Sequence, residues 1–181
     1  MAMLIKDRKI TSDLWVKIDN DNVSPEHVDS FSILPLSVFT QDDILSTQHK
    51  TLGAWFNADI EIDCLTPYVL SLPLLCINVD DFNHGQIFSL ASMIKQHLNY
   101  PGELRATGNL ILDQLPYLHR CGIDSFSILS QSDCEYALFV LQQAPAPSRF
   151  QASGSVRSLS EQRKTGARSG RQTRQSQHQT H

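Results

Sequence analysis

Five short apolar segments, each followed by a segment with a helical pattern, constrain the fold of this chain more than any other feature. The predicted strands are residues 31–37, 52–57, 74–80, 103–108 and 125–130. The predicted helices are residues 40–50, 66–72, 86–99, 109–122 and 132–143. Repeated β-then-α units favour parallel strands joined by right-handed crossovers.

This alternation predicts the α/β class. We expect a mostly parallel five-stranded sheet with helices on both faces, which is a three-layer sandwich. A partial or irregular barrel is the alternative. Residues 3–19 have β-branched and aromatic residues on both sides of a polar break at 11–13, which indicates an N-terminal β-hairpin.

Three local signals refine these elements. Pro116 lies inside the predicted 109–122 helix, which indicates that this helix starts later, with the proline in its first turn. Ser132 and Glu135 have the spacing of a capping box for the last helix. Gly102, Gly108 and Gly122 are expected to meet turn and cap requirements.

Charge divides the chain in two. Residues 1–144 hold 8 basic and 18 acidic residues, whereas residues 145–181 hold 7 basic residues and one acid. The acidic first part disfavours nucleic acid as the partner of the folded domain. The second part is rich in Ser, Gln and Arg, with too few apolar residues to form a core. We therefore predict one domain over 1–144 and a disordered basic tail over 145–181.

The charges of the N-terminal region and the lengths of the apolar segments predict where the protein is located. The first ten residues carry four charges and no following apolar region typical of a secretory signal. The apolar segments are far shorter than the roughly 20 residues that span a bilayer. These observations predict a cytoplasmic protein with no membrane partner, whose four cysteines are reduced and mostly buried.

Motifs for nucleotide phosphates, zinc proteases and serine hydrolases do not occur, so the sequence assigns no catalytic residue and implies no cofactor. Asp80, Asp81 and His84 follow a predicted strand, at the position where open parallel sheets bind ligands. These three could ligate a divalent metal or could cap the following helix. Capping is the commoner role of such a loop, so no metal site is predicted.

Arg105 is the most informative charged residue, because a buried arginine needs a partner. Asp113, Asp80 or Asp81 could pair with it. The functional alternative is an anion clamp in which the planar guanidinium binds a carboxylate, phosphate or sulfite-like ligand. The residues alone leave both interpretations open.

The stretch "GELRATGNLILDQLPYLHRCGIDSF" resembles the signature of a bacterial family of unknown function, DUF934. The resemblance extends to "LIKDRKI", "LGAWF" and "LPLLCINVDDFNHGQIFSLASMIK", and so spans most of residues 3–143. The matching residues are Gly102, Glu103, Arg105, Gly108, Asp113, Gln114, Arg120, Cys121, Gly122, Asp124 and Phe126. His84, Gln86 and Ser92 depart from it, since the family usually has an acid at the first position and arginines at the other two.

The resemblance implies a biological context. Genes of this family commonly lie beside that of the sulfite reductase haemoprotein, and its members are often labelled putative oxidoreductases. The implied function is an accessory role in assimilatory sulfite reduction, in electron delivery to or assembly of sulfite reductase, with that haemoprotein as partner. A small oxidoreductase or an anion- or flavin-binding enzyme is one alternative, and a non-catalytic structural domain is another. The candidate anion or partner site comprises Arg105, Asp113, Gln114, Arg120, Asp80, Asp81 and His84.

Overall fold

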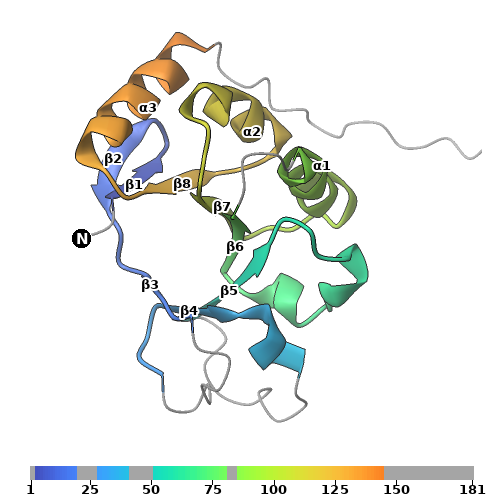
Figure 1. The fold of residues 1–181 in the computed structure, drawn as a ribbon. Coiled ribbons are helices and arrows are strands. Elements are labelled where there is room, and N and C mark those ends of the chain that lie inside the picture. The colour runs from blue at the N-terminus through green and yellow to red at the C-terminus, as the bar shows by residue number, and fades with distance from the viewer. Residues whose placement is uncertain (1–2, 20–27, 41–50, 81–84, 145–181) are drawn as a thin grey trace, which may run out of the picture. The chain divides into compact units, whose positions relative to one another are not determined.

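The computed structural model describes residues 3–19, 28–40, 51–80 and 85–144. Its eight strands form one sheet in the order β2-β1-β8-β7-β6-β5-β4-β3 (Figure 1). The strands are β1 (Met3–Lys6), β2 (Lys9–Ser12), β3 (Val16–Lys17), β4 (Ser32–Pro35), β5 (Leu52–Asn57), β6 (Leu74–Val79), β7 (Glu103–Gly108) and β8 (Ser125–Ile128).

The sheet is mixed, so the expectation of a mostly parallel five-stranded sheet is wrong. The five predicted parallel strands are present as β4 to β8, and they pair parallel to one another in sequence order. β3 extends them at one edge, and the β1–β2 hairpin adds antiparallel strands beside β8 at the other. β3 has only two residues, too few for an apolar pattern to reveal it.

The predicted N-terminal hairpin is present, but its turn lies earlier than the polar break at 11–13. Asp7 and Arg8 form the two-residue turn, with left-handed φ angles of 50° and 57°. Such turns match the right-handed twist of paired strands, which favours them over longer loops. Thr11 and Ser12 therefore belong to β2.

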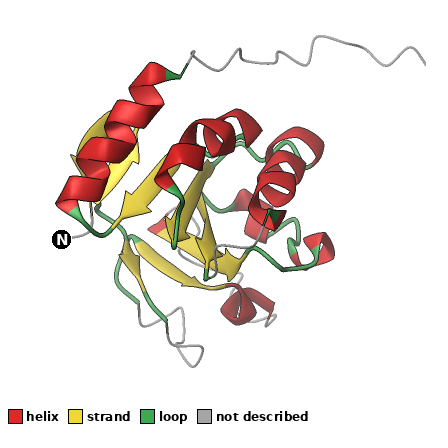
Figure 2. Cartoon of the chain, turned by 45° about the horizontal axis from the view of Figure 1, so that its top comes forward, coloured by secondary structure: helices red, strands yellow, loops and turns green. Residues whose placement is uncertain are grey.

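The helices α1 (Gln86–Ser92), α2 (Leu115–Cys121) and α3 (Gln131–Gln143) pack against one face of the sheet (Figures 1 and 2). Their buried residues join side chains of β1, β6, β7 and β8 in one apolar core. The expectation of helices on both faces of the sheet, as in a three-layer sandwich, is therefore wrong for the part of the chain that the structure describes. α1 continues into a π-helical segment, Met93–His97, so the predicted 86–99 helix is interrupted.

The opposite face of the sheet is concave, and its side chains pack against one another and not against a described helix. β2 and β3 lie at opposite edges of the sheet, yet only residues 13–15 join them along the chain. So short a connection is possible only if the sheet curls until its edges approach, which is nearer to the alternative of a partial barrel. One apolar cluster on this face comprises Ile33, Leu74, Cys76, Trp15 and Trp55.

The ends of the last two helices combine confirmed and corrected predictions. Pro116 lies in the first turn of α2, after a short 3-10 helix over Leu112–Gln114, so the predicted late start is confirmed. Gly122 ends α2 in the left-handed conformation. The predicted Ser132 cap is wrong, because α3 starts one residue before it. Ser130 is the N-cap instead. Its backbone is extended, and its hydroxyl accepts a hydrogen bond from the Asp133 amide.

Other predicted elements are shorter than expected or are not described. The 66–72 helix is reduced to a 3-10 turn over Val69–Ser71, and further 3-10 turns cover Leu36–Thr40 and Ile62–Cys64. Residues 41–50 of the first predicted helix and the 145–181 tail lie outside the described residues. Among the described residues, no helix has the length and apolarity needed to cross a bilayer. Cys76 and Cys134 are buried, whereas Cys64 is exposed.

Candidate functional site

Arg105 lies in β7 and points into the concave face, where it is only 1% exposed. One guanidinium nitrogen donates to Asp13 Oδ2 at 2.7 Å. The other two donate to Glu103 Oε1 at 2.9 and 3.2 Å. All three nitrogens therefore have carboxylate partners, as a buried guanidinium requires.

Glu103 connects this arginine to the neighbouring strands. Its Oε1 also accepts a hydrogen bond from the Ser125 hydroxyl at 2.6 Å, and its Oε2 accepts one from Lys6 Nζ at 2.6 Å. Glu103 and Arg105 share a face because they are two residues apart in one strand, and Ser125 is in register with Arg105 on β8. We call Lys6, Asp13, Glu103, Arg105 and Ser125 the buried charge cluster.

The buried charge cluster binds the segment that closes the curled sheet. Asp13 belongs to the three residues that join the two edge strands, and Arg105 belongs to a central strand. Their ion pair therefore connects the closing segment to the middle of the sheet. This geometry favours the structural interpretation of Arg105, with Asp13 and Glu103 as partners in place of Asp113, Asp80 or Asp81.

Local sequence patterns do not identify Asp13 as a partner of Arg105, whereas they do point to Glu103. Asp13 is 92 residues from Arg105 and has no distinctive pattern around it. The i, i+2 spacing of Glu103 and Arg105 in a predicted strand was a usable signal, because it puts the two side chains on one face.

Protonating Glu103 should destabilise the protein. Burial by itself would raise the pKa of this carboxyl, but hydrogen bonds from Lys6, Ser125 and Arg105 outweigh it and lower the pKa from 4.5 to about 2. Because the folded pKa is depressed, the stabilisation is complete above pH 4.5 and is lost as the pH falls toward 2. We expect Glu103→Gln to cost about 2 kcal/mol at pH 7, allowing for solvent screening on the Lys6 side.

Urea denaturation of both proteins at pH 7 and pH 3 measures this effect. The difference between wild type and Glu103→Gln should shrink at the lower pH. Glu61→Gln, at an exposed position, is the control and should show no such convergence. A constant difference at both pH values would contradict the assignment.

Asp113, Gln114 and Arg120 lie away from the buried charge cluster, in the segment that enters and forms α2. Asp113 is exposed, and its Oδ1 accepts a hydrogen bond from the Tyr136 hydroxyl of α3 at 2.8 Å. Gln114 is the residue before α2, and the exposed Arg120 places its guanidinium 5.4 Å from the centre of the Tyr117 ring. The structure therefore brings Asp113 and Arg120 to the outer side of the helical layer.

Asp80 follows β6 at the carboxyl edge of the parallel strands. Its side chain accepts from the Asn78 amide, and its carbonyl oxygen accepts from the Asn109 side chain at 2.6 Å. Asn78 also donates to Asn57 of β5 at 3.0 Å. This gives a polar edge at the ends of β5, β6 and β7. Asp81 and His84 lie outside the described residues.

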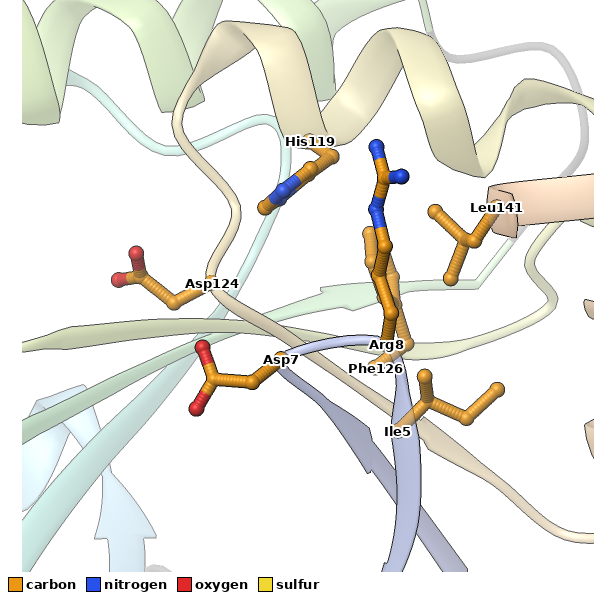
Figure 3. A pocket seen from close by; sticks show the side chains of 7 residues that line it. All are labelled: Ile5, Asp7, Arg8, His119, Asp124, Phe126 and Leu141. Atoms are coloured by element: carbon orange, nitrogen blue, oxygen red, sulfur yellow. The ribbon is translucent and has the colours of Figure 1, made fainter. Parts of the chain in front are cut away.

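A small pocket lies at the opposite edge of the parallel strands, beside the β1–β2 turn (Figure 3). It encloses about 200 Å³ of empty space, part of which is open solvent. The polar residues that line it are Asp7, Arg8, His119 and Asp124. His119 Nδ1 donates to the Ile123 carbonyl at 2.8 Å, and Asp124 pairs with Lys95 at 2.7 Å. Within the described part of the chain, no three His, Cys, Asp or Glu residues form a group suited to a metal ion.

The fold and its polar groups define an α/β domain with a curled mixed sheet, a closed internal ion-pair network and a polar, partly aromatic outer helical surface. A family model described as "Bacterial protein of unknown function (DUF934)" matches residues 53–157. The chain belongs to this family. No curated protein matches the chain, and no solved structure does.

Proposed function

We propose that this protein is a cytoplasmic accessory protein of assimilatory sulfite reduction that assists electron delivery to, or assembly of, sulfite reductase. Membership of the DUF934 family carries this proposal, through the genomic context that the resemblance implies. The matched region includes the segment from Gly102 to Phe126, where the family signature is most specific.

The charge of the domain supports a role in binding a partner. Acids outnumber bases by ten within residues 1–144. Many of these acids are exposed in the structure, among them Asp59, Glu61, Asp113, Asp133 and Glu135. An acidic surface of this kind accelerates and orients docking onto a basic protein surface, particularly at low salt.

A gene-deletion strain tests the proposal. We expect it to grow normally with cysteine but poorly with sulfite as the sulfur source, and sulfite reductase activity in its extract to fall. The intact gene supplied on a plasmid should restore both. Growth on sulfite equal to that of the parent strain, with unchanged reductase activity, would show that the proposal is wrong.

A second candidate, an anion- or flavin-binding enzyme, is favoured by the polar edge formed by Asn57, Asn78, Asp80 and Asn109. Open α/β sheets commonly bind ligands beyond the carboxyl ends of their strands. A thermal-shift series with sulfite, phosphate and flavin mononucleotide tests it. Stabilisation that Asn78→Ala and Asn109→Ala abolish would support this candidate, whereas no shift with any of the three would reject it.

A further inference from the structure

Helices α2 and α3 present aromatic side chains to solvent on their outer faces. Tyr117 of α2 is 57% exposed, and Tyr136 and Phe139 of α3 are 48% and 56% exposed. The same helices bury Leu115, Leu118, Cys134, Ala137 and Leu141 against the sheet. The aromatic residues therefore lie on the sides of the helices that face away from the core. We call Asp113, Tyr117, Arg120, Tyr136 and Phe139 the α2–α3 surface.

Direct contacts hold this surface together. The hydrogen bond from Tyr136 to Asp113 spans 23 residues and connects α3 to the segment that enters α2. Arg120 lies over the Tyr117 ring, one turn away on the same helix. Tyr136 and Phe139 are three residues apart, so they are neighbours along one side of α3. Asp113, Tyr136 and Phe139 therefore form one patch, and Tyr117 and Arg120 lie on the neighbouring helix α2.

The Tyr136 hydrogen bond restrains an exposed side chain. An exposed tyrosine ordinarily samples several rotamers, and ordering it on binding costs conformational entropy. Asp113 restricts this freedom before any partner arrives, and its hydrogen bond and negative charge raise the pKa of the Tyr136 phenol. Tyrosine and arginine are also enriched among the residues that dominate binding at protein interfaces.

Charge indicates what covers the surface. Asp113 belongs to it, and Asp133 and Glu135 are exposed on the same α3 helix. Arg120 is the basic residue of the surface, and it stacks on Tyr117. An acidic border around exposed aromatic rings is complementary to a partner that has basic side chains around an apolar recess.

We propose that the α2–α3 surface is the docking surface for a protein partner with a basic-bordered apolar recess. This inference rests on the proposed function, in which that partner is sulfite reductase. Tyr136 and Phe139 enter the recess, and Asp113, Asp133 and Glu135 face its basic border. Three motif residues of the family signature, Asp113, Gln114 and Arg120, then lie at or beside the contact.

Binding of the full-length protein to purified sulfite reductase tests the proposal. Tyr136→Ala with Phe139→Ala should weaken binding at least 30-fold at low salt while leaving the melting temperature of the free protein nearly unchanged. Leu14→Ala, at a 72% exposed position outside the surface, is the matched control and should stay within 3-fold of wild type. Asp113→Asn should weaken binding and reduce its salt dependence.

The possible outcomes separate the two proposals. If wild type binds and the double variant binds equally well, the docking surface is wrong and the accessory function stands. If wild type does not bind at any salt concentration, the accessory function fails and the docking surface fails with it. Sedimentation of the free protein gives a further check. A dimer that the double variant converts to a monomer would identify a second copy of this chain as the occupant and overturn the basic partner.

Discussion

Replacing Arg105 with alanine is expected to lower the free energy of unfolding by about 3–5 kcal/mol, because it leaves buried carboxylates without their cation. Asp13 is affected most, since its side chain is 7% exposed and pairs with Arg105. Glu103 keeps its hydrogen bonds from Lys6 and Ser125. The segment between β2 and β3 therefore loses its ion pair to the centre of the sheet and keeps only the apolar packing of Trp15.

Chemical denaturation at pH 7 measures the change, with Arg120→Ala as the control. Arg120 carries the same charge in an exposed position, so its loss should cost less than about 1 kcal/mol. Arg105→Lys should lie between the two, because an ammonium cannot reproduce the contacts of a planar guanidinium with two carboxylates. If Arg105→Ala were as stable as Arg120→Ala, the buried charge cluster would not be holding the curled sheet closed.

Gly108→Ala is expected to cost about 3 kcal/mol, from left-handed strain and from overpacking against the neighbouring strand. Gly108 has a φ of 91°, a conformation that L side chains rarely adopt. A Cβ atom there would overlap the carbonyl oxygen of Val79, its partner in register on β6. That oxygen also accepts a 2.7 Å hydrogen bond from the Asn109 amide, so it cannot move without loss.

Gly85→Ala is the matched control for this prediction. A Cβ atom at Gly85 meets no atom within 4 Å, and its φ of −55° suits any residue. The unfolding midpoint of Gly85→Ala in urea should be equal to or slightly above that of wild type. Equal midpoints for Gly108→Ala and wild type would mean that the end of β7 can rearrange without cost.

Glycine is needed at three positions of the signature segment for two different reasons. Gly108 and Gly122 have left-handed backbones, as their predicted turn and cap roles require. Gly102 has no such angle. There, a Cβ atom would collide with the hydroxyl of Tyr100, which donates to the Leu72 carbonyl in the core. A close approach of this kind depends on where a distant residue packs, so sequence patterns do not reveal it.

At the candidate site, too, local patterns predict some features and the packing of distant segments sets the others. Arg105 was expected to have an acidic partner, and the structure gives it two, but Asp113 is not one of them. Asp113 is bonded to Tyr136 and Arg120 lies over Tyr117, because α2 begins only at Leu115, with Pro116 in its first turn. The turn of the chain before this helix carries Asp113 outward to Tyr136.

The five parallel strands, their order along the chain, the late start of α2 and the family can all be predicted from the amino-acid sequence alone. These features depend on apolar runs, turn residues and motif spacing within short stretches, where chain connectivity limits the alternatives. Three further features emerge only in the folded domain: the sheet is mixed and curled, its described helices share one face, and Asp13 neutralises Arg105. Those features depend on contacts between distant segments, such as the ion pair that joins Asp13 to Arg105 across 92 residues. The packing of the whole domain sets these contacts, and no local pattern reveals them.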